Sequence, residues 1–200
     1  MDTRQAACAC TRMNSTCMPD HPEPEDSDLM LRTAAGDMAA FETIVRRHQQ
    51  KLMNFFVRMG VNTGRAEELV QDTLLRVFRN SGRYRASARF TTFLYTIARN
   101  ALIDELRRNQ REEDAIAEET ARLNAGHDCG LAGMQARMDV RSALSKLPPK
   151  LREPVILSVY QGMRYEEIAD VLKIPLGTVK SRIFLAMRAL RNLLDENTKT

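Results

Sequence analysis

Residues 165–184 carry the pattern of two short helices joined by a tight turn, and this pattern constrains the fold more than any other feature of the chain. Tyr165-Glu-Glu-Ile-Ala-Asp-Val-Leu172 is followed by Lys-Ile-Pro-Leu-Gly and then by Thr178-Val-Lys-Ser-Arg-Ile-Phe184. Proline and glycine between two helical segments favour a turn. Apolar residues recur in and beyond the second segment at a period near 3.6, which places one face in a core: Val179, Ile183, Ala186, Leu190 and Leu194. The pattern predicts a helix-turn-helix.

The opposite side of the second helix predicts a DNA-binding surface. No acidic residue occurs between Lys173 and Leu194, so this side suits a phosphate-lined major groove. The alternative is an ordinary amphipathic helix with a solvated outer face. The residues expected to face DNA are Thr178, Lys180, Ser181, Phe184, Leu185 and Arg188.

Charge is divided into blocks along the chain, which the net charge of +4 does not reveal. The net charge is −3 for residues 1–26, +7 for 27–111, −4 for 112–138 and +4 for 139–200. Two basic blocks separated by an acidic one favour nucleic acid as a partner over a small acidic substrate, although basic membrane-surface proteins look similar. No apolar run approaches a membrane span, and the first residues lack the apolar core of a signal peptide. We expect a cytoplasmic protein without membrane insertion.

The four cysteines predict no disulfide framework. Three lie in the polar N-terminal tail and one lies in the middle of the chain, without a Cys-x-x-Cys pair. Their spacing matches no zinc pattern, so we expect free thiols, no bound metal and no cofactor. The alternative is a metal or redox sensor built from Cys8, Cys10, Cys17 and His21, while Cys129 has only His127 nearby.

The N-terminal half predicts a helical domain after a tail. Residues 1–26 are polar, have no periodic apolar face and are expected to be disordered. Apolar periodicity then predicts helices over residues 41–59, 63–78 and 90–108, and no segment has the alternation of a strand. We therefore expect an all-α protein of two small helical domains, because 200 residues with 44% hydrophobic content can form one or two modest cores.

Local signals mark the helix ends and faces. Gly60 is expected to end the first helix, and Asn62 or Thr63 can cap the second. The periodicity places His48 in the core or at its boundary. It also turns five residues outward on the second helix, four of them polar: Gln71, Asp72, Leu75, Arg76 and Arg79.

A basic and aromatic block lies between the second and third helices. No acidic residue occurs from Thr73 to Ile103, while arginines alternate with phenylalanine and tyrosine. Guanidinium groups neutralise phosphates, and aromatic faces or a loop pocket accept unstacked bases, each base contributing about 1 to 3 kcal/mol. The alternative is that the aromatic residues form the core. Periodicity favours this alternative for Phe78 and Phe93, but less for Tyr84, which lies in a Gly-Arg-Tyr-Arg loop.

Three motifs resemble the extracytoplasmic-function sigma factors of bacterial RNA polymerase. They are Glu68-Leu-Val-Gln-Asp-Thr-Leu-Leu-Arg-Val-Phe78, Phe90-Thr-Thr-Phe-Leu-Tyr-Thr-Ile-Ala-Arg-Asn100, and Tyr165-Glu-Glu-Ile-Ala with Gly177-Thr-Val-Lys-Ser-Arg-Ile-Phe184. The resemblance implies a promoter-melting region 2 at residues 27–111, a flexible acidic linker at 112–138 and a minus-35-binding region 4 at 139–195. It implies core RNA polymerase, promoter DNA and an anti-sigma factor as partners.

The resemblance also implies roles for residues in the first two motifs and the loop between them. Polymerase is expected to contact Glu68, Gln71, Asp72, Leu75, Arg76 and Arg79. Single-stranded minus-10 DNA is expected to contact Tyr84, Arg85, Ala86, Ser87, Ala88, Arg89, Arg76, Arg79, Arg99 and Asn100. We expect one unpaired base to be held against the segment from Tyr84 to Arg89, whether or not Tyr84 stacks on it.

The chain departs from the family pattern at three positions. Arg164 stands where Ser or Thr usually precedes the Tyr-Glu-Glu motif, so a side-chain cap worth about 1 kcal/mol is lost. Leu185 stands where many members carry a basic residue, and Phe93 replaces a frequent tryptophan. The first two changes lie in the predicted DNA-binding domain. Phenylalanine at position 93 keeps an aromatic side chain in the expected core.

Two other classes of protein fit the sequence less well. A stand-alone repressor or activator would use the same helix-turn-helix, usually as a dimer, but would leave the basic and aromatic block unexplained. An enzyme would need paired catalytic groups, and neither Asp72 nor Asp104 has a second carboxylate, histidine or metal ligand at helical spacing. We therefore expect no catalytic residues.

Overall fold

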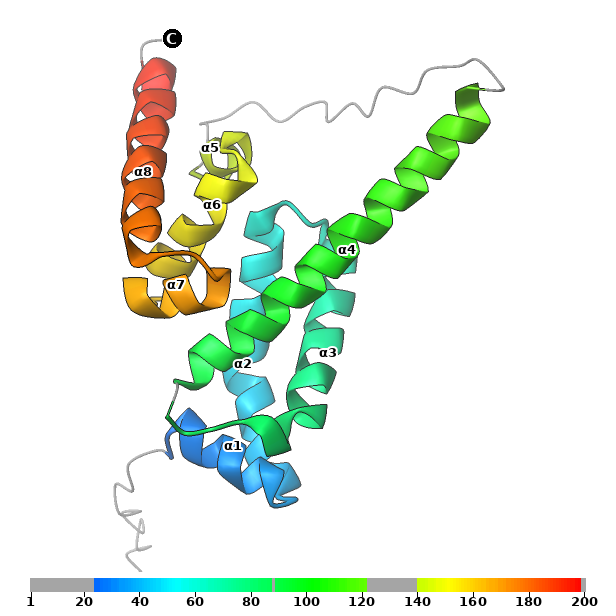
Figure 1. Ribbon diagram of the computed structural model, residues 1–200, viewed down its shortest axis with the longest axis vertical. Helices are drawn as coiled ribbons and strands as arrows, with labels where there is room; N and C mark the ends of the chain where they lie inside the picture. The colour runs from blue at the N-terminus through cyan, green and yellow to red at the C-terminus, as the bar shows by residue number, and fades with distance from the viewer. Residues whose placement is uncertain (1–23, 88, 122–139, 199–200) are drawn as a thin grey trace, which may run out of the picture.

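A computed structural model describes residues 24–87, 89–121 and 140–198, and these residues contain helices and turns but no strand. The predicted all-α class is confirmed. The elements are α1 (Asp26–Ala34), α2 (Met38–Met59), α3 (Thr63–Arg79), η1 (Ser81–Arg83), α4 (Phe90–Ala121), α5 (Val140–Lys146), α6 (Pro149–Val155), η2 (Ile156–Tyr160), α7 (Tyr165–Leu172) and α8 (Leu176–Thr198). Helices α1 to α4 form one bundle, and α5 to α8 form a second bundle beside it (Figure 1).

Capping residues set the ends of the N-terminal helices. Gly60 adopts a left-handed conformation, with φ of 99°, immediately after α2. The Asn62 side chain accepts a hydrogen bond from the Arg65 amide at 2.8 Å and so caps α3. Both predicted helix ends are confirmed.

The core of the N-terminal bundle is formed largely by the apolar faces predicted from periodicity, with added residues from α1. Helix α4 crosses α2 and α3 diagonally (Figure 1), and Leu94 and Ala101 face inward from it. His48 is 1% exposed, which confirms its predicted core position. Its deeply buried apolar residues include Leu29, Met30, Ile44, Leu52, Phe55, Phe56, Ala66, Val77, Leu94 and Tyr95.

Two features of this bundle differ from the sequence prediction. Helix α1 begins at Asp26, inside the expected tail, and its nine residues were too few to show a clear period. Helix α4 continues to Ala121, ten residues into the expected linker. Residues 112–121 are mostly Glu and Ala, which have high helix propensity and favour continuation of the helix. Residues 122–139, like most of the N-terminal tail, lie outside the described part of the chain.

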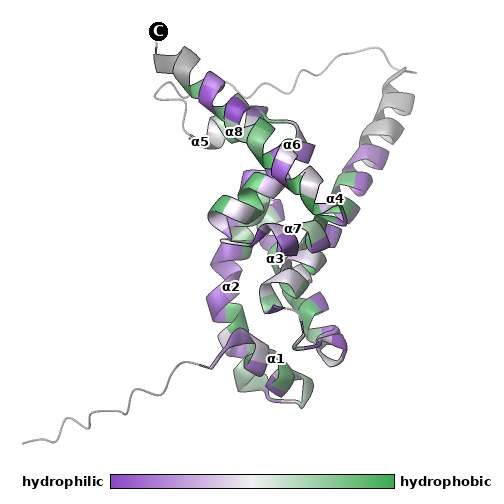
Figure 2. Cartoon of the chain, turned by 60° about the vertical axis from the view of Figure 1, so that its left-hand side comes forward, coloured by the Kyte–Doolittle hydropathy of each residue, from purple (hydrophilic) through white to green (hydrophobic). Residues whose placement is uncertain are grey.

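The C-terminal bundle contains the predicted helix-turn-helix. Arginine has no hydrogen-bond acceptor and cannot cap α7, but the Glu167 carboxylate accepts from the Arg164 amide at 2.8 Å and satisfies the reciprocal bond of a capping box. Lys173 ends α7 in the left-handed region, with φ of 54°. Helix α8 begins at Leu176, two residues before the expected start, and the carbonyl of the preceding Pro175 accepts hydrogen bonds from the Thr178 and Val179 amides. In Figure 2, hydrophobic and hydrophilic residues alternate along α8, as expected for a helix with one buried side.

The two bundles contact one another directly. Helix α7 packs beside α4, and one continuous cluster of buried side chains includes Leu94 of the first bundle with Ile156 and Ile168 of the second. A smaller cluster inside the C-terminal bundle joins α5, α6 and α8 through Leu144, Val155 and Leu190. The expected pair of helical units is therefore present, and their surfaces meet.

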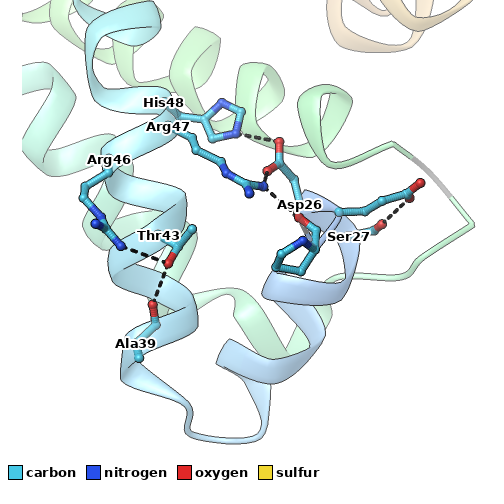
Figure 3. Close-up of polar contacts among 9 residues, drawn as sticks. Asp26, Ser27, Ala39, Thr43, Arg46, Arg47 and His48 are labelled. Carbon is cyan, nitrogen blue, oxygen red and sulfur yellow. Dashed lines mark hydrogen bonds and ion pairs between the residues drawn. The ribbon is translucent and has the colours of Figure 1, made fainter. Parts of the chain in front are cut away.

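A partly buried ion cluster ties the start of α1 to α2 (Figure 3). The Asp26 carboxylate contacts Arg47 Nη1 at 2.8 Å and His48 Nε2 at 2.7 Å, and Arg47 also donates to the Pro24 carbonyl. Burial would raise the pKa of Asp26, but the bonds to Arg47 and His48 outweigh it and lower that pKa. Burial lowers the pKa of His48 despite the nearby Asp26. Neutral His48 is the form that this cluster favours.

Acid is expected to destabilise the fold through this cluster. The unfolded chain protonates His48 near its ordinary pKa of 6.5, whereas the folded chain resists protonation, so stability falls as the pH drops below that value. The lowered pKa of Asp26 adds a further loss below its ordinary value of 3.8. Thermal unfolding should show a lower midpoint at pH 5 than at pH 7 in the wild type, and a smaller difference in H48Q. An equal difference in both proteins would remove His48 from the pH response.

Candidate nucleic-acid and polymerase interfaces

The outer face of α8 is exposed as predicted. Val179, Ile183 and Ala186 are buried, while the side chains on the opposite side point away from the bundle. Phe184 is 68% exposed at the centre of this face, which is unusual for a large aromatic residue and leaves its ring available to a partner. Thr178 is half-buried and its carbonyl accepts from Ser181 Oγ at 3.0 Å. The exposed members of the predicted set are Lys180, Ser181, Phe184, Leu185 and Arg188.

The loop between α3 and α4 is short, basic and largely exposed. After the η1 turn, Arg85 folds back and donates to the carbonyls of Gly82 and Tyr84, each at 3.2 Å. Arg85, Ala86, Ser87 and Arg89 are exposed, and Ala88 lies outside the described residues. Internal hydrogen bonds therefore hold part of this loop in place before any ligand binds.

Tyr84 corrects the sequence interpretation. It was expected to be less buried than the other aromatic residues, but its side chain is only 3% exposed. Its ring packs against Phe93 and Phe90, with centroids 5.4 Å and 6.2 Å away. Tyr84 therefore belongs to the core and anchors the loop, and its ring face is not available to stack on a base.

Two hollows flank this loop. One, of about 290 Å³, lies between α3, η1 and α4, and its polar lining comes from Arg76, Arg83 and Asn100 together with Asn80 and Thr96. The second, of about 630 Å³, lies between the loop, the start of α1 and α2. Its lining includes Ala86, Ser87, Arg89, Arg47, Asp26 and Phe90.

The expected minus-10 residues are thus divided between different surfaces. Arg76 and Asn100 line the smaller hollow, whereas Ala86, Ser87 and Arg89 line the larger one. Sequence reasoning missed Asn80, Arg83 and Thr96 as lining residues. Helical spacing offered a signal for Thr96, which lies four residues before Asn100 and so shares its face.

Two of the expected DNA-binding arginines contact the C-terminal bundle. Arg99 Nε lies 2.9 Å from Glu153 Oε1, and Arg89 Nε lies 3.1 Å from Glu167 Oε1. Burial raises the pKa of Glu153, and Arg99 acts in the opposite direction. No helical periodicity could have indicated these pairs, because their members are more than 50 positions apart.

The outward face of α3 combines exposed apolar and charged groups. Leu75 is 52% exposed, and Glu68, Gln71 and Arg79 are also exposed, as predicted. Asp72 and Arg76 are half-buried because they pair with one another at 2.9 Å. Arg76 also contacts Asp104 of α4 at 2.9 Å, so α4 helps to hold its side chain.

A partly buried ion pair between α3 and α4 lies beside this outward face of α3. Glu105 of α4 is 5% exposed, and its carboxylate accepts two bonds from the Arg65 guanidinium, at 2.5 Å and 2.6 Å. The same carboxylate contacts Arg108 at 2.9 Å. A planar guanidinium matched to a buried carboxylate fixes α3 against α4, and sequence analysis did not identify this pair.

Comparison with protein families assigns each bundle to a known domain family. Residues 44–112 match the model of Sigma-70 region 2, and residues 137–190 match that of Sigma-70 region 4. RNA polymerase sigma factor CarQ of Myxococcus xanthus is 39% identical over 170 residues, covering 84% of this chain and 96% of the relative. The chain belongs to the extracytoplasmic-function (ECF) sigma factors. The ECF sigma factor SigE of Mycolicibacterium smegmatis is 33% identical to this sigma factor over 189 residues, covering 88% and 71% of the two chains.

Two solved structures share the arrangement of this sigma factor. CnrH, in complex with the cytosolic domain of CnrY, matches with a TM-score of 0.65 and 27% identity over 86% of this chain and 97% of CnrH. RpoE of Bartonella quintana, in complex with the anti-sigma factor NepR, matches with a TM-score of 0.63 and 26% identity over 78% and 96% of the two chains.

Family membership establishes the general function of this sigma factor. It acts in promoter recognition and in transcription initiation by RNA polymerase, as its region 2 and region 4 matches indicate. No helix in the described ranges is long and apolar enough to span a membrane. Those ranges also contain no group of three or more metal-ligating side chains, while the N-terminal cysteines of the alternative sensor lie outside them.

Proposed function

We propose that this sigma factor divides promoter recognition among three surfaces of its two bundles. The exposed face of α8 reads the minus-35 duplex, the loop between α3 and α4 captures a minus-10 base, and the outer face of α3 docks on core polymerase. The observation that carries this proposal is that one chain exposes two basic surfaces on separate bundles. A dimeric repressor would need only one of them.

The chemistry of α8 supports duplex binding. Lys180 and Arg188 can contact phosphates or the acceptor groups of guanine, and the exposed Phe184 ring can contact a thymine methyl group. Leu185 flanks this surface where many family members carry a basic residue, which removes one expected phosphate contact. We infer that the protein tolerates this loss through its remaining basic residues.

Replacing Lys180 by alanine should weaken promoter binding by the holoenzyme by about 1 to 3 kcal/mol, because a good contact to a base is worth that much. Fluorescence anisotropy with a minus-35 duplex measures the effect. K150A is the matched control, because Lys150 is exposed on α6 away from this face.

L185R should tighten binding to all sequences alike if the missing contact is to phosphate. If folded K180A and F184A bind and transcribe promoters normally, the exposed face of α8 does not bind the minus-35 duplex.

The larger hollow beside the loop is the proposed site for the unpaired base. Its volume of about 630 Å³ is ample for a nucleobase, and its lining offers hydroxyl, guanidinium and carboxylate groups. The Phe90 ring lies in the same lining and supplies an apolar surface, which Tyr84 does not. Arg79 and Asn100 are exposed and available for neighbouring phosphates and bases.

The remaining partners follow from the proposed family role. Nucleotide chemistry belongs to the polymerase, so we propose that this chain has no enzymatic activity, and that it acts in the cytoplasm where polymerase and promoters are. An anti-sigma factor is a further proposed partner, because both structural relatives above were solved with a bound partner protein, and NepR, the partner of RpoE, is named an anti-sigma factor.

A further inference from the structure

Large apolar side chains are concentrated on the exposed side of α8. Phe184 is 68% exposed, and Leu185 and Met187 are each 49% exposed. No other four consecutive residues in the described part of the chain hold three exposed apolar side chains of this size. Exposed apolar groups that occur singly are ordinary, whereas a contiguous patch of them indicates a binding partner.

Helical spacing places two of these apolar side chains between two cations. Phe184 follows Lys180 by four positions, and Met187 follows Phe184 by three. Arg191 follows Met187 by four positions, and all four residues are exposed. Residues three and four apart are neighbours on a helix surface. The exposed side of α8 therefore carries a row of cation, aromatic ring, thioether and cation, with no acid between them.

This row fits a DNA groove better than the apolar surface of another protein. A protein that covered Phe184 and Met187 would also bury the neighbouring Lys180, which has no acid within two turns of it on α8. A buried cation without a partner is strongly unfavourable. In a duplex, phosphates line the edges of the major groove and neutralise such cations, while the base edges lie between them.

The major groove offers one apolar group to these side chains. It is the C5-methyl group of thymine, because the other base edges present hydrogen-bond donors and acceptors there. An apolar side chain against a G·C edge would leave those polar groups without a partner. Positions 184 and 187 lie about 4.5 Å apart along the helix axis, close to the spacing of about 3.4 Å between neighbouring base pairs. Phe184 and Met187 therefore match the methyl groups of two neighbouring base pairs.

We propose that Met187, together with Phe184, selects minus-35 elements that contain neighbouring A·T pairs, by covering the thymine methyl groups of these pairs. This inference rests on the proposed binding of the minus-35 duplex by α8, and it adds Met187 to the residues predicted from the sequence. Lys180 supplies a polar contact, and the two apolar side chains supply part of the choice of sequence. Each covered methyl group raises the affinity about three- to fourfold.

Replacing thymine by uracil tests this proposal, because uracil lacks the methyl group and keeps the hydrogen-bonding groups of thymine. The probe is a fluorescein-labelled promoter fragment on which the holoenzyme starts transcription, prepared with uracil for every thymine of the minus-35 element. A control fragment carries the same number of uracils in the spacer between the two promoter elements. Fluorescence anisotropy gives the affinity of the holoenzyme for each fragment.

The protein variant is M187Q, which replaces the thioether by a polar side chain of similar length without changing the charge. The matched control is M38Q, because Met38 is also an exposed methionine, at 59%, and lies at the start of α2 in the other bundle. Each variant is measured on the thymine and uracil fragments. The four affinities of M187Q and the wild type form a double-mutant cycle, which isolates the contact between Met187 and a methyl group.

The wild-type holoenzyme should bind the minus-35 uracil fragment about tenfold more weakly than the thymine fragment, because two covered methyl groups are lost. It should bind the spacer control as well as the thymine fragment. M187Q should bind the thymine fragment about threefold more weakly than the wild type, and uracil should weaken its binding only about threefold further. M38Q should behave as the wild type on every fragment.

Equal affinity of the wild type for the thymine and uracil fragments would overturn the inference. If K180A still weakens binding in that case, α8 binds the duplex without reading methyl groups, and the proposed minus-35 role stands; if K180A binds normally, that role fails as well. An equal effect of uracil on M187Q and the wild type would overturn the role of Met187. Loss of binding to core polymerase by M187Q would also overturn it, because the side chain would then contact a protein partner.

Discussion

Replacing Asp72 by arginine is expected to abolish binding to core RNA polymerase. Asp72 lies on the outward face of α3 beside the exposed Leu75, and its carboxylate pairs with Arg76 at 2.9 Å. An arginine at position 72 would place its guanidinium beside that of Arg76 on the proposed docking face. Charge reversal at a desolvated interface costs about 2 to 5 kcal/mol, which lowers affinity by at least thirtyfold.

Surface plasmon resonance with purified core polymerase measures this loss. E42R is the matched control, because Glu42 is exposed on α2 and belongs to none of the proposed surfaces. Circular dichroism should give the same helicity for both variants and the wild type. Unimpaired binding by D72R would remove Asp72 from the interface and leave the outer face of α3 without a demonstrated role.

Replacing Arg85 and Ser87 together by alanine is expected to reduce transcription from duplex promoters at least tenfold. Opening DNA costs a few kcal/mol for each unstacked step, so the protein must hold the opened strand more tightly than the duplex. Ser87 lines the larger hollow, and Arg85 is exposed on the same loop. The variant loses a hydroxyl and a guanidinium where an unpaired base would be captured.

Templates mismatched across the minus-10 region distinguish melting from docking. Pre-opening the template should restore most of the activity of R85A/S87A, because the unfavourable step has already been made. R46A/T43A is the control, since it removes an arginine and a hydroxyl from α2 at a distance from the loop (Figure 3). An equal loss on both templates would instead assign the loop to polymerase docking or to general DNA affinity.

Helical periodicity and capping chemistry are local, and the features that depend on them could be predicted. The stripe through Val179, Ile183 and Ala186 is buried, and Gly60 and Asn62 end and begin their helices as expected. The exposed side of α8 follows from the same period. Its candidate DNA contacts could therefore be named from the sequence.

Features that depend on tertiary context could not be predicted in this way. Tyr84 lies in a polar loop, yet two aromatic rings on α4 bury it. Helix α1 is short, and its start is fixed by an ion cluster with α2, 21 and 22 positions away in sequence. The Glu153 and Glu167 contacts depend on how two bundles meet. Neither helical periodicity nor net charge indicates such contacts.

The central claim is that this chain directs core polymerase to promoters, and run-off transcription with purified core polymerase on genomic fragments tests it most directly. With the wild-type chain, core polymerase should start discrete transcripts downstream of two shared sequence elements at constant spacing. Core polymerase without the chain should produce no such transcripts. The start sites should disappear with D72R and weaken with K180A. The claim would be contradicted if the chain alone bound palindromic duplex sites and left the choice of start site by core polymerase unchanged.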